Sequence, residues 1–277
     1  MPVFNAEGTI LRALESLKKI PESSRPLVEV VIIDDCSPDK SLTVVEKNLF
    51  PGFSWMILKQ EKNNLIAARN RGLSEAKGQW IMFLDADDEL GSDPIPFLDE
   101  NCTAIGFKIK FLKESGLSFN WQSVLIKPEN FWEIFTAENP FTISSLIFKK
   151  EKMSALFNPD FLFLEDWFFW ISSPSFFERM AVVNETSAII HLHSAGRSAR
   201  TLEMGGCRSR IAKKVLSDFD QKLTKKQKNN LLIQMAVGDL QQGKKVKLDQ
   251  VLFLWPCNFK LYFKLLIYLF SKGQVRV

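Results

Sequence analysis

The chain has 277 residues, of which 46 % are hydrophobic and 25 % are charged, and its formal net charge is +4. Such a composition is typical of a globular protein with a sizeable core, and the charge is too small to indicate nucleic-acid binding. The four cysteines are widely spread and form no CxxC pair, so the sequence predicts neither a zinc site nor a disulfide framework. This cysteine usage favours a reducing compartment, and we expect a cytoplasmic protein.

Helical and strand patterns alternate along the first third of the chain. This alternation is typical of an α/β fold with a mostly parallel sheet. The predicted elements are a helix over 9–18, strands over 28–33 and 53–59, a helix over 64–78 and a strand over 80–84.

Acidic side chains gather where two of these strands end. Ligands of parallel sheets bind at the carboxyl ends of the strands, so the acids mark a candidate site. Like charges this close raise one another's pKa, and we therefore expect something positive among them. The acids are Asp34 and Asp35 after the first strand, and Asp85, Asp87 and Asp88 after the strand over 80–84.

Asp85 and Asp87 form a D-x-D motif. Two carboxylates two residues apart can reach one hard cation together, and Mg²⁺ and Mn²⁺ often share such oxygen ligands with substrate phosphates. A metal held there would neutralise a diphosphate leaving group. The alternative is a plain surface turn, in which aspartate is common. The preceding strand and the second acidic strand end favour the site.

The predicted secondary structure changes twice in the remainder of the chain. Residues 100–193 mix strands with short helices, and the pattern from about residue 201 onward is helical and basic. In the mixed part we predict strands over 104–115 and 141–152, a helix over 164–173 that stops at Pro174, and two short strands around a turn over 181–193.

Four segments of the sequence read PVFNAE, EVVIIDDCSPDKS, NLIAARNRGLSEAKGQWIMFLDADD and FLEDWFFW. Together they resemble family 2 glycosyltransferases of the GT-A fold. The resemblance implies a Rossmann-like mixed sheet flanked by helices. It implies a catalytic domain over 1–200 and leaves 201–277 as a helical C-terminal extension. The family has a short apolar strand directly before PVFN, so we expect the native start to lie upstream of Met1.

The resemblance assigns several residues to the nucleotide-sugar. Pro2, Phe4 and Glu7 fall in the family's first nucleotide-binding loop, where Phe4 replaces the usual tyrosine. Asp35 resembles the residue that reads the uracil ring. Arg69 matches the arginine that packs near the nucleotide and the D-x-D motif.

Further positions correspond to the family's sugar, metal and catalytic residues. Asp85 resembles the ribose or sugar contact, and Asp87 resembles the metal ligand bound to the diphosphate. His193 resembles a late histidine that completes the metal site in some relatives, although His191 stands where the family has arginine. Asp166 resembles the general base that deprotonates the acceptor hydroxyl.

The resemblance therefore implies an inverting transfer that depends on Mn²⁺ or Mg²⁺. The donor would be a nucleotide-sugar, with UDP favoured by Asp35, and the acceptor a hydroxyl of a glycan or lipid-linked molecule in surface polysaccharide or cell-envelope synthesis. We expect no nucleic-acid partner. Phenylalanines and lysines within 251–272 predict either a helix that packs on the catalytic domain or a peripheral contact with the inner face of the membrane.

Two other functions fit parts of the sequence. A GT-A-fold protein that binds without catalysis would keep the same strands and loops. FLDADDEL also resembles the D-x-D strand of haloacid-dehalogenase-type phosphatases. In those enzymes threonine or valine occupies the place that Glu89 takes here.

Overall fold

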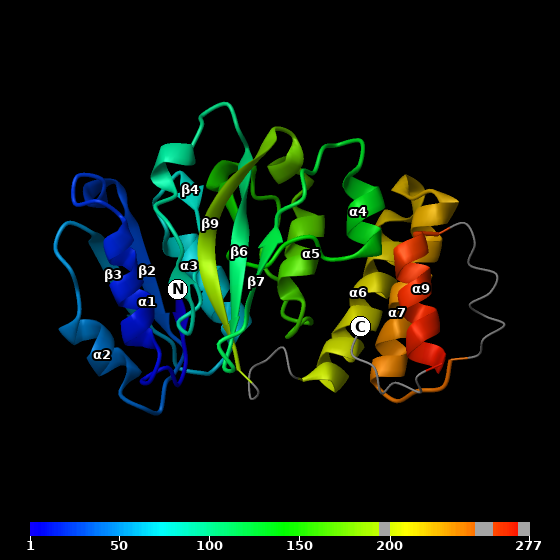
Figure 1. Cartoon of the computed structure of the whole chain (residues 1–277), viewed down its shortest axis with the longest axis horizontal. Helices are drawn as coiled ribbons and strands as arrows, with labels where there is room; N and C mark the ends of the chain where they lie inside the picture. The colour runs from blue at the N-terminus through cyan, green and yellow to red at the C-terminus, as the bar shows by residue number, and fades with distance from the viewer. Residues whose placement is uncertain (194–199, 247–256, 271–277) are drawn as a thin grey trace. The chain divides into compact units, whose positions relative to one another are not determined.

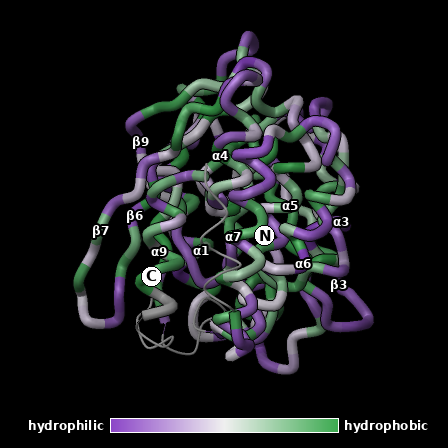
Figure 2. The backbone as a smooth tube through the Cα atoms, turned by 90° about the vertical axis from the view of Figure 1, so that its right-hand side faces the viewer, coloured by the Kyte–Doolittle hydropathy of each residue, from purple (hydrophilic) through white to green (hydrophobic). Residues whose placement is uncertain are grey.

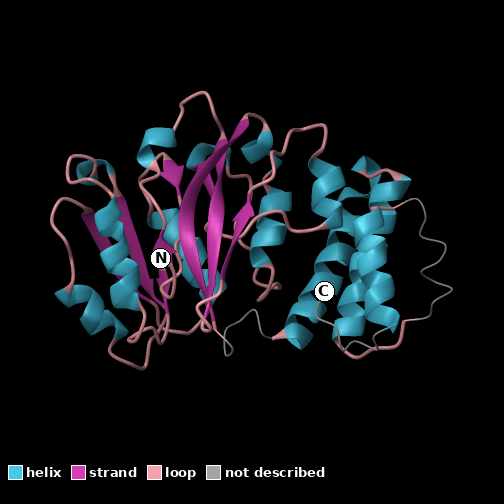
Figure 3. Cartoon of the chain, in the orientation of Figure 1, coloured by secondary structure: helices cyan, strands magenta, loops and turns pink. Residues whose placement is uncertain are grey.

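The computed structural model describes residues 1–193, 200–246 and 257–270, and the chain divides into two compact units (Figure 1). All of the described strands belong to the first unit, and the described part of the second is helical (Figure 3). The first unit comprises Met1–Pro128, Phe141–Pro159 and Phe169–His193; the second comprises Glu129–Pro140, Asp160–Phe168 and Ser194–Val277.

A parallel sheet forms the amino-terminal part of the first unit. Its strand order is β1-β2-β3, and both pairings are parallel, as the alternation of elements predicts. Ile10, Leu14 and Ile32 are fully buried, so α1 packs its apolar face into the same core as β2. The elements are β1 (Pro2–Val3), α1 (Ile10–Ser16), η1 (Leu17–Lys19), β2 (Glu29–Asp34), α2 (Ser41–Lys47), β3 (Ser54–Lys59) and α3 (Leu65–Glu75).

A second, mixed sheet completes this unit. Its order is β4-β8-β6-β9-β5 with β7 paired to β6, and β6 and β9 run parallel while the other pairs are antiparallel. Figure 1 shows β6 and β9 side by side along much of their length. The strands are β4 (Trp80–Ile81), β5 (Glu89–Leu90), β6 (Ala104–Lys113), β7 (Ser118–Gln122), β8 (Leu146–Lys149) and β9 (Met180–Leu192).

The prediction of two short strands around a turn over 181–193 is wrong. The structure has one continuous strand, β9, and its register against β6 shifts near Lys108. Asn184 and Glu185 favour a turn locally, but pairing with the long β6 supplies backbone hydrogen bonds that a turn would lose. An irregularity in the register absorbs the mismatch without ending the strand.

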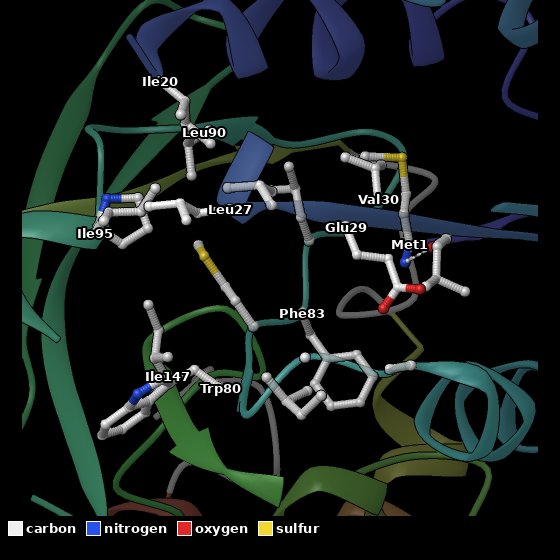
Figure 4. Close-up of a pocket in the computed structure, with 18 of the residues that line it drawn as sticks. Met1, Ile20, Leu27, Glu29, Val30, Trp80, Phe83, Leu90, Ile95 and Ile147 are labelled. Carbon is white, nitrogen blue, oxygen red and sulfur yellow. Dashed lines mark hydrogen bonds between the residues drawn. The ribbon is translucent and has the colours of Figure 1, made fainter. Parts of the chain in front are cut away.

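An apolar cavity of about 360 Å³ lies in the first unit between β2 and the segment over 80–84. Figure 4 shows its lining side chains, among them Leu27, Trp80 and Ile147. None of the predicted site residues lines this cavity. Its lining offers little for a charged diphosphate, so the candidate site lies elsewhere.

The second unit is built around two long helices. Thr224 and Gln227 form a capping box that begins α7, and Ile233 of α7 packs with Leu261 and Leu265 of α9. Figure 2 shows hydrophobic stretches along these helices. No helix among the described residues has both the length and the hydropathy needed to cross a bilayer. The helices are α4 (Phe131–Ala137), α6 (Thr201–Phe219), α7 (Lys225–Gln241) and α9 (Phe259–Phe270), and α5 (Glu165–Ser172) is shared between the units.

Glycines bring α6 and α7 into backbone contact. A Cβ on Gly238 would lie 2.5 Å from the Gly205 carbonyl oxygen and 2.9 Å from the Ser209 nitrogen. We expect Gly238→Ala to lower the free energy of unfolding by about 1–3 kcal/mol, because neither backbone can yield without separating the helices. Urea denaturation followed by circular dichroism measures this change.

Gly206→Ala is the matched control. A Cβ on Gly206 would meet the ends of the Gln242 and Arg210 side chains, which can rotate away. We expect this variant to keep wild-type stability or to gain up to about 1 kcal/mol from helix propensity. Equal losses in the two variants would contradict the close backbone approach at Gly238.

Candidate functional site

Two loops at the carboxyl ends of β1 and β2 are tied together by hydrogen bonds. The Ala6 N–H donates to Ser41 Oγ at 2.7 Å, and the Glu7 N–H donates to Asp39 Oδ2 at 2.8 Å. In return, the Lys40 N–H donates to Glu7 Oε2 at 3.1 Å. The Glu7 side chain therefore fastens one loop to the other.

Phe4 presents a free aromatic face in this region. Its side chain is 49 % exposed, whereas Pro2 is buried within β1. A large apolar ring exposed beside polar loops is suited to stacking on a planar base. The structure thus places Phe4 where a base could reach it, and it places Pro2 as part of the strand that supports the loop.

Asp35 is buried at the end of β2, and its carboxylate already accepts several hydrogen bonds. Oδ1 accepts from Gln60 Nε2 at 2.6 Å and from the Asn64 N–H at 2.7 Å, and Oδ2 accepts from Asn63 Nδ2 at 3.3 Å. Burial raises the pKa of Asp35, while the Asn64 and Gln60 hydrogen bonds oppose that rise. Lone-pair capacity on Oδ2 remains for one further donor.

Gln60 and Asn63 are residues that the sequence analysis did not assign to the site. Both lie in the loop after β3 and hold the Asp35 carboxylate. Their place in the site could have been predicted from the run of polar residues that follows the third parallel strand, because ligands bind at the carboxyl ends of such strands.

The positive partner expected among the acids is an arginine. Arg69 Nη2 lies 3.1 Å from Asp85 Oδ1, and the Arg69 side chain is only 3 % exposed. Its guanidinium also lies over the Phe157 ring, 5.7 Å from the centroid. Two predicted site residues, Arg69 and Asp85, are therefore brought into direct contact by α3 and the strand end after β4.

The surroundings of the other acids of the loop disfavour their ionised forms. Burial, and then the charge of Asp85, raises the pKa of Asp87. Burial raises the pKa of Asp88 to about 8, and the charges of Asp85 and Asp87 add to that effect. The His191 N–H donates to Asp88 Oδ1 at 2.9 Å. Such a cluster gains stability when a cation approaches it.

His193 lies close enough to act on this cluster. Its charge, when present, lowers the pKa of Asp87. Its Nδ1 is 3.7 Å from Glu114 Oε1, and its Nε2 is a buried atom that has no hydrogen-bond partner among the described residues. A buried imidazole nitrogen without a partner beside a carboxylate is a suitable ligand for a divalent cation.

The donor set fits a metal that shares its ligands with a substrate. Among the described residues, no group of three or more His, Cys, Asp or Glu side chains has the arrangement of a complete protein metal site. Mg²⁺ and Mn²⁺ commonly take only one or two carboxylates and fill the other positions with phosphate oxygens and water. Asp87 and His193 suit that type of site, while Arg69 keeps Asp85 engaged.

Asp166 lies in the first turn of α5, and it alone among the predicted site residues belongs to the helical unit. Its Oδ1 accepts a hydrogen bond from the Trp167 N–H at 2.8 Å. Trp167 is buried, and its indole N–H donates to the Phe135 carbonyl at 3.0 Å. The Trp167 indole is thus held in place, and it stabilises the start of α5, which carries Asp166.

Backbone strain coincides with the loops that the sequence singles out. Among the described residues, the non-glycine residues with positive φ are Asn5 at 49°, Cys36 at 64° and Leu164 at 56°. They lie in the PVFNAE loop, directly after Asp35, and two residues before Asp166. Strained backbone that persists in a fold clusters at functional sites.

Replacement of Cys36 by glycine tests this strain. The left-handed conformation costs a non-glycine residue about 1–2 kcal/mol, and glycine escapes that cost while losing more entropy on folding. We expect Cys36→Gly to stabilise the protein by about 1 kcal/mol, which raises Tm by about 2–4 °C. Cys36→Ser is the control, since it removes the thiol and keeps the strain. An equal rise in Tm for both variants would show that the thiol, rather than φ, is responsible.

Comparisons with known proteins find relatives of the amino-terminal third of the chain. The model of glycosyl transferase family 2 matches residues 1–98. The amylovoran biosynthesis glycosyltransferase AmsB of Erwinia amylovora is 37 % identical over 98 residues, which are 34 % of this chain and 32 % of AmsB. The match therefore spans about a third of the length of that relative.

Solved structures extend the similarity over the fold. Residues 1–349 of Staphylococcus aureus TarS, in complex with UDP, align with a TM-score of 0.65 and 20 % identity, covering 98 % of this chain and 86 % of that chain. The mannosyltransferase PcManGT of Pyrobaculum calidifontis, with GDP-Man and Mn²⁺, aligns with a TM-score of 0.60 and 15 % identity over 99 % and 74 % of the two chains. The fold is therefore of the GT-A type, and residues 1–98 match the model of glycosyl transferase family 2.

Proposed function

We propose that this protein transfers a sugar, with inversion, from a UDP-sugar to a hydroxyl of a glycan or lipid-linked acceptor in surface polysaccharide or cell-envelope synthesis. The observation that carries the proposal is the acidic loop after β4. There, Asp85 is held by the buried Arg69, and the charge of His193, whose buried Nε2 has no hydrogen-bond partner among the described residues, acts on Asp87. A binding site for a diphosphate and its metal accounts for charges that the protein alone leaves unbalanced.

The donor would lie along the carboxyl ends of β1, β2 and β4. Phe4 stacks on the base, and Asp35 accepts one hydrogen bond from it through the remaining capacity of Oδ2. Asp85 contacts the ribose or sugar, and Arg69 orients Asp85. UDP is favoured because TarS has been solved with UDP and with UDP-GlcNAc.

Asp87 and His193 would hold Mn²⁺ or Mg²⁺. The bound metal supplies charge neutralisation for the departing diphosphate. Asp88, whose carboxylate accepts the His191 N–H, keeps the loop against β9 so that Asp87 faces the diphosphate. Support for a metal comes from the carboxylate and imidazole donors and from PcManGT, which is described with Mn²⁺.

Asp166 would act as the general base. It takes the proton from the acceptor hydroxyl at one carboxylate oxygen while that hydroxyl oxygen bonds to the anomeric carbon and the bond from this carbon to the diphosphate breaks. The first turn of a helix stabilises a carboxylate. The hydrogen bond from the Trp167 N–H fixes the orientation of the Asp166 carboxylate at the start of α5.

A donor and acceptor screen tests the function. The protein is incubated with a panel of UDP-hexoses, lipid-linked and polymeric acceptors and Mn²⁺, and UDP release is measured. We expect release that requires both one acceptor class and the metal. Binding of UDP without turnover on any pair would favour a non-catalytic binding protein. Phosphate release from phosphomonoesters would favour a phosphatase.

We also propose a peripheral membrane contact through the predicted segment 251–272. Residues 251–256 and 271–272 lie outside the described residues, but α9 exposes 70 % of Phe259 and 54 % of Phe263. We expect the protein to float with anionic vesicles, and the double substitution Phe259→Ala and Phe263→Ala to reduce the bound fraction severalfold, because the rings lose buried apolar area.

Leu202→Ala is the control for this experiment, since Leu202 is 59 % exposed on α6. We expect it to float like the wild type. Equal flotation of the control and the α9 variant would contradict the proposed contact.

A further inference from the structure

Three polar side chains on one face of α1 and η1 hold the backbone that follows the D-x-D motif. Arg12 Nη2 donates to the Asp87 carbonyl oxygen at 2.5 Å. Ser16 Oγ accepts from the Leu90 N–H at 2.8 Å, and Lys19 Nζ donates to the Leu90 carbonyl oxygen at 2.6 Å. Their spacing of four and then three residues places them in one row along the helix.

This backbone depends on side chains because it lies at the end of a sheet. β5 is the last strand in its sheet order, and its paired neighbour is β9. The outward N–H and carbonyl of Leu90 therefore have no strand partner, although Leu90 is 2 % exposed. Buried backbone groups require hydrogen bonds, and α1 and η1 supply them.

Arg12 also enters a polar chain that crosses the acidic loop. Its Nε lies 3.7 Å from Glu89 Oε1, and the same oxygen lies 2.8 Å from His191 Nε2. The His191 N–H in turn donates to Asp88. His191 of β9 thus holds Asp88 and Glu89. Arg12 of α1 holds Asp87 through its carbonyl oxygen.

The amino-terminal end of α1 follows directly after the PVFNAE loop. The Ile10 N–H donates to the Ala6 carbonyl at 2.8 Å, and the Ala6 N–H is bound by Ser41. One short helix therefore contacts both the loop that carries Phe4 and the loop that carries Asp87. A shift of α1 would therefore displace groups that hold both loops.

We infer that Arg12 is a positioning residue that sets the place of Asp87 and, through α1, couples binding of the nucleotide to binding of the divalent cation. This inference rests on the proposed function, which supplies the two ligands. Arg12 acts on the Asp87 backbone, to which its guanidinium donates a hydrogen bond. Loss of Arg12 should therefore weaken the cooperation between nucleotide binding and cation binding. The affinity for each ligand alone should stay unchanged.

Calorimetric titration of UDP with and without Mn²⁺ measures this cooperation. In the wild type we expect Mn²⁺ to increase the affinity for UDP. In Arg12→Met we expect the factor by which Mn²⁺ increases the UDP affinity to fall about tenfold. The UDP affinity without metal should stay at the wild-type value. Arg12→Lys restores part of the increase, because an ammonium can still reach the carbonyl. Lys18→Met, which removes an exposed ion pair with Glu15, keeps the full increase.

Each outcome separates the inference from the proposed function. A wild-type increase that persists in Arg12→Met overturns the inference and leaves the function intact. Parallel losses of metal-free and metal-dependent affinity also overturn it, since they indicate general damage to the fold. A wild type that shows no metal-dependent UDP binding overturns both. If Arg12→Met does not fold, Arg12→Gln supplies the same comparison with a neutral, shorter donor.

Discussion

Asp87→Ala is expected to lower sugar transfer by at least about 10³-fold and to remove the effect of Mn²⁺ on UDP binding. Arg69 engages Asp85, so Asp87 is the carboxylate of the motif that we assign to the metal. The leaving diphosphate would then depart without its neutralising charge. Turnover measured at saturating donor and acceptor, with Mn²⁺ in excess, gives the magnitude.

The same substitution is expected to leave the fold intact. Burial and the charge of Asp85 raise the pKa of Asp87, so its ionised form is unfavourable in the metal-free protein. Removing it relieves repulsion, and Tm should stay constant or rise. Asp93→Asn, at a neighbouring acid outside the cluster, serves as the control and should transfer sugar at the wild-type rate. Full metal-dependent turnover by Asp87→Ala would contradict the assignment of this residue.

Asp166→Asn is expected to reduce kcat by about 10²–10⁴-fold while the affinity for UDP remains unchanged. Asparagine keeps the oxygen that accepts the Trp167 N–H, so the start of α5 is preserved, but it cannot take a proton. The loss should therefore appear in kcat at saturating acceptor. Donor binding, measured by calorimetry on the same variant, should match the wild type.

Glu165→Gln distinguishes Asp166 from the adjacent acid. Glu165 is 6 % exposed, and its side chain is more deeply buried than that of Asp166. We expect Glu165→Gln to retain most of the wild-type kcat. If instead Glu165→Gln abolishes transfer and Asp166→Asn does not, the base is Glu165.

The sequence predicts the parallel part of the fold well for a physical reason. The strands of β2 and β3 are continuous apolar runs bounded by polar loops, and the acids at the end of β2 are local signals. These features depend on residues close together in the chain, where periodicity and loop chemistry are informative.

Features that depend on distant partners could not be predicted. Arg12 reaches the Asp87 carbonyl across 75 residues, and nothing near Arg12 indicates an acidic loop. The continuity of β9 is decided by its pairing with β6, which overrides the local turn preference of Asn184. Such contacts are set by the tertiary fold, and a single sequence carries no local signal for them.

The central claim is that a nucleotide diphosphate and a divalent cation bind together at the acidic loop after β4. Calorimetric titration of the folded wild-type protein with UDP, in Mn²⁺ and again in a chelator, tests it most directly. We expect saturable binding that Mn²⁺ strengthens and that Asp87→Ala makes independent of the metal. Absence of UDP binding in Mn²⁺ by a protein with a cooperative thermal transition would contradict it.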